Sequence, residues 1–177
     1  GGAFSFFRQF RRFAFLSRYQ LAKTYAISGQ ASDPASLRDT TLSEVSLSGS
    51  YDRRDSFTDP SRGYFTLVGV RFFNEISGGR ADFTKLRNVF SHYLTPFHLI
   101  TFASTFRIDK IQDLISASSI PQRELYGLGG DDTVRGFRED RAGPLDANGN
   151  PLGGRTRLIF NEEVKARLSR SVQMAVF

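Results

Sequence analysis

The sequence has no cysteine and no tryptophan, and only two of its 177 residues are histidine. Without cysteine there is no disulfide framework, no thiolate metal site and no cysteine nucleophile. The histidines, His92 and His98, are too few for a zinc site unless acidic residues join them. We therefore expect neither a metal nor a cofactor.

Long apolar runs are also missing. No stretch approaches the roughly 18 uninterrupted apolar residues of a membrane helix, and no signal peptide opens the chain, which begins abruptly at Gly1 and Gly2. If a protein of this composition crosses a membrane, it must do so with strands, which need only every second residue to be apolar.

Basic residues outnumber acidic ones, with 24 Lys and Arg against 18 Asp and Glu, a net charge of +6 and a pI of about 10.0. Such a balance can indicate a nucleic-acid partner. Here the basic residues are scattered singly along alternating segments such as 155–167, and they form no block. We therefore expect a solvated or lumen-facing surface and no nucleic-acid partner.

Alternation of apolar and polar residues recurs along the chain and predicts strands. In the segment 45–51, Val45, Leu47 and Tyr51 share one face, while serines share the other with Glu44 and Asp52. A helix would not keep this period of two. The predicted strands are 3–8, 13–27, 45–51, 64–76, 83–94, 98–110, 158–168 and 172–177.

The connectors alternate between short and long. The short ones are 9–12, 58–63, 95–97 and 169–171, and the long ones are 29–42, 77–82 and 111–154. Short turns at one end and longer loops at the other are typical of an up-and-down transmembrane barrel. We predict an all-β fold, an antiparallel up-and-down transmembrane β-barrel of which the chain supplies about eight strands. A soluble β-sandwich is the alternative, because alternation does not report which solvent covers the apolar face.

The long connector carries a glycine pair, Gly129 and Gly130, followed by Val134, Arg135, Gly136 and Phe137. This resembles the sixth extracellular loop of the Omp85 superfamily, in which Val-Arg-Gly-Phe is the best-known motif. Residues 50–64 resemble the turn that precedes this loop by three strands in the same family. The matching turn residues are Asp52, Arg54, Asp55, Pro60 and Gly63.

The resemblance implies that residues 1–177 are a partial barrel domain, from about the seventh strand to the fourteenth of sixteen, without the periplasmic repeats of the family. It places the protein in the bacterial outer membrane. Within the family, Gly143, Pro144 and Asp146 after the motif favour the BamA branch. The two-partner secretion and TamA branches remain open, as does a passive porin in another class.

By the same resemblance the protein is an assembly factor and not an enzyme. Its partners are unfolded outer-membrane proteins as substrates, accessory outer-membrane lipoproteins and the lipid bilayer. Substrate strands are expected to pair with a seam that lies outside this chain.

Arg135 is the candidate latch of the long connector. A guanidinium inside a barrel needs a carboxylate to offset its desolvation. The resemblance points to Glu163 as the partner, and the alternation independently places Glu163 on the polar face beside Asn161 and Lys165. Gly136 is expected to allow a tight turn or a close approach, and Phe137 to pack against the inner wall. A second acidic partner is expected on the following strand.

Two other sites are rejected. Asp146, Asn148 and Asn150 imitate half of a calcium loop, but Pro151 stands where glycine is required and Arg157 where the bidentate glutamate belongs. A polar turn is the better interpretation. The glycines at 127, 129 and 130 lack the lysine and hydroxyl residue of a phosphate-binding loop, so we interpret them as loop flexibility.

Overall fold

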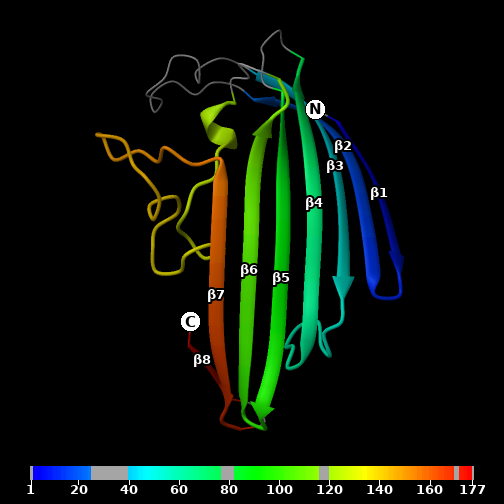
Figure 1. Cartoon of the computed structure of the whole chain (residues 1–177), viewed down its shortest axis with the longest axis vertical. Coiled ribbons are helices and arrows are strands. Elements are labelled where there is room, and N and C mark those ends of the chain that lie inside the picture. The colour runs from blue at the N-terminus through cyan, green and yellow to red at the C-terminus, as the bar shows by residue number, and fades with distance from the viewer. Residues whose placement is uncertain (1, 25–39, 77–81, 116–119, 170–171, 177) are drawn as a thin grey trace.

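The computed structural model describes residues 2–24, 40–76, 82–115, 120–169 and 172–176. Eight strands form one antiparallel sheet in which each strand pairs with the next along the chain (Figure 1). The strands are β1 (Ala3–Phe10), β2 (Phe13–Thr24), β3 (Thr40–Asp52), β4 (Gly63–Glu75), β5 (Phe83–Phe97), β6 (Ile100–Asp113), β7 (Thr156–Arg167) and β8 (Gln173–Val176). The up-and-down topology is confirmed, and the two-layer sandwich is excluded because all eight strands belong to one curved sheet.

The two faces of the sheet differ sharply in chemistry, because neighbouring residues of a strand point to opposite sides. One row across the sheet runs Phe10, Phe13, Tyr51, Thr66, Phe90, Phe106 and Phe160. Most side chains of this outer face are exposed although they are large and apolar, among them Phe4, Phe6, Phe15, Val68, Phe72, Leu86, Leu158 and Phe160. A surface this broad and apolar is covered by something other than water.

The opposite face, here called the inner face, is polar. A row across its middle runs Gly69, Arg87, Asp109 and Arg157. At one end of this face a small core of Leu42, Phe73, Phe83 and Ile111 is buried. The rings of Phe73 and Phe83 stack with their centroids 4.7 Å apart.

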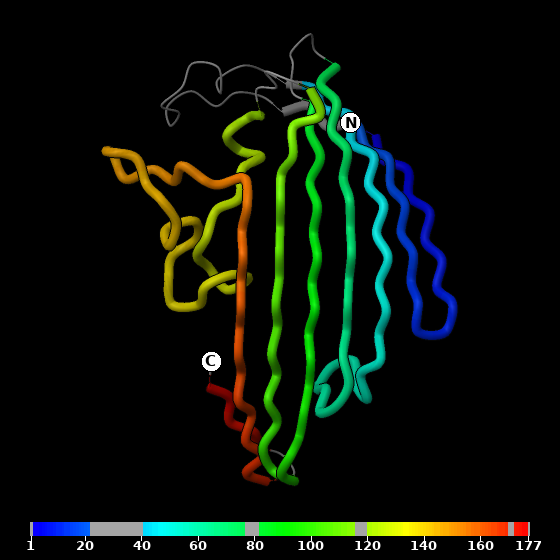
Figure 2. Tube along the Cα trace, in the orientation of Figure 1, coloured from blue at the N-terminus to red at the C-terminus, as the bar shows by residue number. Residues whose placement is uncertain are grey.

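The connector between β6 and β7 carries the short 3-10 helix η2 (Gln122–Glu124). It supplies Ile120, Leu125 and Tyr126, which pack against the small core. Figure 2 shows that the connector folds back beside β7 instead of extending past the strand ends. Its base closes through paired backbone hydrogen bonds between Tyr126 and Gly154, at 2.9 and 2.8 Å.

Some predicted boundaries were wrong. The turn expected around Pro96 lies at 98–99 instead, and Pro96 is inside β5, where the pairing register shifts between Leu94 and Phe97. Proline has no N–H for the ladder, so it is accommodated at this irregularity. The long connector begins after Asp113 and not at Ile111, which is buried in β6. The residues 25–27, predicted to extend the second strand, lie outside the described residues.

None of the helical structure in the described residues is long and apolar enough to cross a membrane.

Candidate functional site

The turn between β3 and β4 begins with an ion pair. Arg54 donates from Nε to Asp52 Oδ1 at 3.0 Å and from Nη2 to Asp52 Oδ2 at 2.6 Å. The backbone N–H of Arg54 also reaches Asp52 Oδ1 at 3.0 Å. The guanidinium lies 5.1 Å from the Phe57 ring and 5.0 Å from the Phe65 ring. The Asp52 carboxylate binds one edge of the Arg54 guanidinium, and two aromatic rings flank it. These contacts stabilise the start of the turn in one conformation.

Asp55 organises the rest of this turn. Its carboxylate accepts the Ser61 hydroxyl at 2.5 Å and the backbone N–H groups of Ser56, Ser61 and Arg62 at 3.0, 2.9 and 3.1 Å. These bonds favour the charged form, the Ser61 hydroxyl most strongly, and lower the pKa of Asp55 from 3.8 to about 2. A single carboxylate thus ties both ends of the turn together.

Gly63 closes the turn where no other residue fits. Its φ is +103°, and a Cβ built there lies 2.2 Å from the carbonyl oxygen of Arg53. The strands approach each other here through the bond from Arg53 N to Tyr64 O, 2.8 Å long. Pro60 is buried within the same turn.

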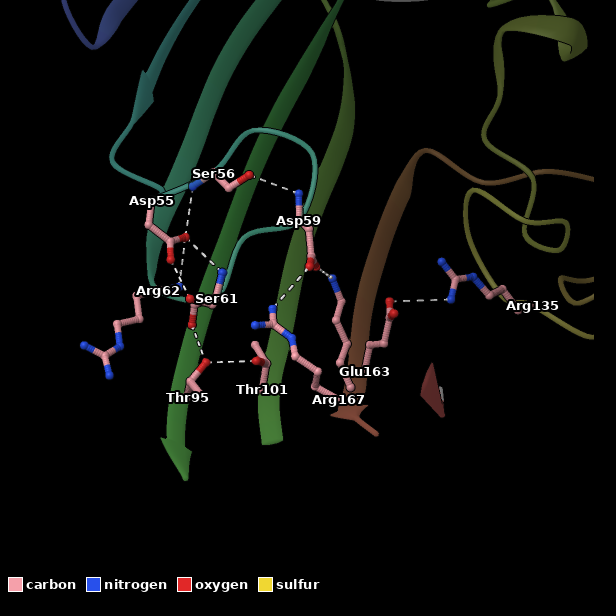
Figure 3. A network of polar contacts seen from close by, with 11 residues as sticks. Asp55, Ser56, Asp59, Ser61, Arg62, Thr95, Thr101, Arg135, Glu163 and Arg167 are labelled. Atoms are coloured by element: carbon pink, nitrogen blue, oxygen red, sulfur yellow. Dashed lines mark hydrogen bonds and ion pairs between the residues drawn. The ribbon is translucent and has the colours of Figure 1, made fainter. Parts of the chain in front are cut away.

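The β3–β4 turn reaches across the inner face to β7 (Figure 3). Asp59 Oδ1 lies 3.4 Å from Lys165 Nζ, and Asp59 Oδ2 lies 3.6 Å from Arg167 Nη2. On the way, Thr95 of β5 donates to the Ser61 carbonyl at 2.8 Å, and its hydroxyl pairs with Thr101 of β6 at 2.8 Å. The turn therefore contacts two strands to which it is not joined in sequence, β5 directly through Thr95 and β7 through Lys165 and Arg167.

The base of the long connector is held by a buried charge cluster on the inner face. Asp109 is fully buried, and it accepts from Arg87 Nε at 2.8 Å and from Arg157 Nη2 at 2.7 Å. Arg157 also donates from Nη1 to the Gly127 carbonyl at 2.9 Å, and its guanidinium lies 4.8 Å from the ring of Tyr126. One arginine therefore joins the barrel wall to the connector.

Lys85 of β5 forms a second contact between the wall and the connector. Its ammonium donates to the Glu124 carbonyl at 2.6 Å and lies 2.8 Å from Glu124 Oε2. The same Nζ lies 5.5 Å from the Phe73 ring and 5.4 Å from the Tyr126 ring. Because Lys85 is only 7% exposed, the charge depends on these partners.

The glycines of the connector occupy backbone conformations that the fold requires, a role that the expectation of loop flexibility did not include. Gly129 has φ +120°, and a Cβ there lies 2.1 Å from the Arg138 carbonyl oxygen. Its N–H donates to the Thr133 hydroxyl at 2.8 Å, and that hydroxyl donates back to the Gly129 carbonyl at 2.6 Å. Gly130, at φ +86°, donates to the Phe137 carbonyl at 3.0 Å. The backbone is compact here, which only glycine allows.

The tip of the connector brings Arg135 to Glu163. Arg135 Nη1 lies 3.8 Å from Glu163 Oε2, and the side chains are 46% and 27% exposed (Figure 3). Glu163 pairs with Ala103 across the sheet and faces inward with Tyr93 and Thr105. The contact is an ion pair within reach of water, weaker in geometry than the cluster at Asp109.

The residues next to Arg135 in the motif differ in burial and packing. Val134 is partly buried and lines the same cavity as Arg135. Gly136 turns the chain at φ +87°, but a Cβ there would meet nothing within 4 Å, so no close approach requires it. Phe137 is 56% exposed and does not pack against the inner wall as expected. Its backbone is engaged in the tight turn with Val134 and Gly130, and the ring is left largely in solvent.

A cavity of about 580 Å³ separates the β3–β4 turn from the connector tip. Charges of both signs line it, including Arg54, Asp131, Arg135, Glu163 and Lys165. Among the described residues that line it there is no serine, cysteine or histidine.

Asp146 forms the polar turn that the sequence predicted. Its Oδ1 accepts the N–H groups of Asn148 and Asn150 at 2.9 and 2.7 Å. Within the described ranges, no group of three or more His, Asp or Glu side chains is placed to hold a metal ion.

The sequence did not identify Asp109, Arg157, Lys85 or Glu124 as site residues. Alternation placed Asp109 and Arg157 on the polar face, and Lys85 lay in a segment whose faces were unclear. The one available signal was an acid, Asp109, on a face whose preceding inward residues are small, hydroxylic or basic, namely Thr101, Ala103, Thr105 and Arg107. The contacts of Asp109 with Arg87 and Arg157 depend on the strand register, and the link from Arg157 to the connector depends on the path of the connector. Neither can be predicted from the local sequence.

One curved antiparallel sheet with a broad apolar outer face, a polar inner face and a connector folded onto that inner face defines the wall of an up-and-down β-barrel. The sequence model of the Omp85 superfamily domain matches residues 5–177. The chain belongs to the Omp85 superfamily, a family of outer-membrane proteins.

The fold resembles the crystal structure of BamA from Haemophilus ducreyi lacking POTRA domains 1–3, with a TM-score of 0.70 and 14% sequence identity. The similarity covers 96% of this chain and 37% of that one, so the chain spans well under half of the BamA structure. At this identity the likeness concerns the fold. No curated protein matches the sequence.

Proposed function

We propose that this chain is the back wall and internal loop of a BamA-type assembly factor, which inserts unfolded outer-membrane proteins into the bacterial outer membrane. Substrate strands pair by β-augmentation with a seam outside residues 1–177. Accessory lipoproteins and the bilayer are the other partners. The process needs no covalent chemistry and no cofactor.

The observation that carries the proposal is the connector folded onto the inner face, with Arg135 3.8 Å from Glu163. The connector is anchored at its base by Lys85 and Arg157 and tethered again at its tip, so it is held against the wall at two levels. A brace against the wall opposite the seam lets one side of a barrel open while the other side keeps its shape. The match to the superfamily over residues 5–177 supports the same role.

The test is reconstitution of the intact protein into liposomes, followed by addition of a urea-unfolded outer-membrane protein. We expect the substrate to fold faster than with empty liposomes, measured by its heat-modifiable electrophoretic mobility. Arg135→Glu should slow this step, and Arg135→Glu combined with Glu163→Arg should restore it. Arg138→Ala, which removes a nearby exposed arginine of the same connector, is the matched control.

No acceleration by the intact protein would contradict the proposal. Export of a soluble passenger into the liposome lumen would assign the chain to a secretion branch of the family. Ion conductance with neither activity would indicate a passive pore.

A further inference from the structure

An apolar groove of about 600 Å³ crosses the outer face over β1, β2, β3 and β4. Phe6, Phe10, Phe13, Phe15 and Tyr51 are among its lining residues. Its floor contains Gly49, which pairs with Phe15 on one side and Val68 on the other. A Cβ at Gly49 would meet nothing within 4 Å, so the missing side chain leaves open space between larger neighbours.

Among the described residues that line this apolar groove, Arg8 alone is charged. It lies on the outer face because it alternates in phase with Phe6 and Phe10. The turn at the end of the same hairpin adds Arg11 and Arg12. Residues 2–24 contain no Asp or Glu, and among the described residues these three arginines make no ion pair. A positive cluster beside an apolar groove is suited to attract an anion that carries an apolar chain.

Arg11 occupies backbone that arginine rarely adopts. Its φ is +52°, in the left-handed region where glycine or asparagine is less costly. Its guanidinium lies 5.8 Å from the Phe10 ring. A charged residue held at a strained turn position is typical of a functional contact.

A chain of aromatic rings crosses the outer face from the β1–β2 turn. Phe13 and Tyr51 have ring centroids 4.5 Å apart, Tyr51 and Tyr64 are 5.8 Å apart, and Tyr64 and Phe90 are 6.2 Å apart. Phe13, Tyr51 and Tyr64 lie at the ends of their strands, where aromatic side chains on the lipid face of a barrel are typical of the headgroup level. Arg8 is two residues from Phe10, within reach of that level for a long side chain.

We propose that this groove binds one membrane phospholipid, with the phosphate held by Arg8, Arg11 and Arg12 and an acyl chain lying along the apolar floor past Gly49. The inference rests on the membrane location contained in the proposed function. It adds a defined lipid site on the wall remote from the β7 edge, where the connector is anchored.

The test is native mass spectrometry of the intact protein released from detergent micelles containing phosphatidylglycerol, compared with diacylglycerol of the same chains. We expect retention of one phosphatidylglycerol and no retained diacylglycerol. Arg8→Gln should weaken retention about fivefold, the effect of one interfacial arginine. Gly49→Leu should also weaken it while leaving every charge in place. Arg18→Gln, on the inner face of the same hairpin, is the matched control and should bind normally.

Equal retention by wild type, Arg8→Gln and Gly49→Leu overturns the lipid site, as does equal binding of diacylglycerol. Displacement of the lipid by millimolar inorganic phosphate would also overturn it, because the groove would then contribute nothing. All variants are first checked for heat-modifiable mobility. A protein that folds in micelles and assembles substrates but retains no lipid contradicts this inference alone, whereas one that folds without detergent contradicts the proposed function.

Discussion

Arg157 Nη2 lies 2.7 Å from Oδ2 of the fully buried Asp109, and the same guanidinium holds the connector at the Gly127 carbonyl. Arg87 donates to the other carboxylate oxygen at 2.8 Å. The carboxylate therefore neutralises cations from β5 and β7, and its removal leaves these cations facing each other on the inner wall.

We predict that Asp109→Asn lowers the free energy of unfolding of the intact protein in lipid vesicles by about 3–5 kcal/mol, because it breaks a buried ion pair from one side. Chemical denaturation measures this directly. Asp131→Asn removes the same charge from an exposed connector position and should change stability by less than about 0.5 kcal/mol. Equal effects of the two substitutions would show that the buried cluster does not stabilise the wall.

The pair of Arg135 and Glu163 should contribute little to stability. With side chains 46% and 27% exposed and 3.8 Å between the charged atoms, we predict a coupling energy of about 0.2–1 kcal/mol. A double-mutant cycle of Arg135→Ala and Glu163→Ala isolates this value from the other contacts of either residue. A coupling above about 3 kcal/mol would mean that the two groups are desolvated together, contrary to their exposure.

Gly63→Ala should destabilise the protein by at least about 1–3 kcal/mol, because alanine at φ +103° is strained and its Cβ overlaps the Arg53 carbonyl. Gly49→Ala provides the comparison, since its Cβ enters open space on the outer face. We expect that change to be neutral within about 0.5 kcal/mol. Unfolding midpoints of both variants in the same vesicles test the pair, and a neutral Gly63→Ala would contradict the observed turn.

Acid should weaken the β3–β4 turn in a defined window. The pKa of Asp55 is lowered from 3.8 to about 2 by the Ser61 hydroxyl and three backbone N–H groups, so the folded state favours the charged form. Its stabilising effect is therefore complete above about pH 4 and is lost as the pH falls through about 2. The difference in unfolding midpoint between wild type and Asp55→Asn should be constant from about pH 5 to 7 and shrink below about pH 4. A difference that persists unchanged at about pH 2 would contradict this assignment.

The sequence predicted the number and order of strands because alternation is a local property. Residues such as Val45 and Leu47 report their face within a few positions, and the sheet confirms that face. The inward position of Glu163 followed from the same rule. Strand ends were harder to place, as at Pro96, where a register shift in the pairing keeps a proline inside β5.

The anchoring of the connector could not be predicted in this way. Lys85 and Glu124 are 39 residues apart, and Asp109 and Arg157 are 48 apart, so nothing local links them. The fixed conformations of Gly129 and Gly63 depend on carbonyls at Arg138 and Arg53 that approach only in the folded chain. Composition alone makes such glycines look flexible, whereas close packing makes them necessary.

Asp59 joins the β3–β4 turn to Lys165 and Arg167 of β7, and these contacts bridge the concave inner face of the sheet. A contact across a concave face limits how far the strands on either side can move apart. Both contacts are partly exposed, so each resists widening by only about 0.2–1 kcal/mol. These two ion pairs therefore oppose a widening of the sheet between β3 and β7 only weakly.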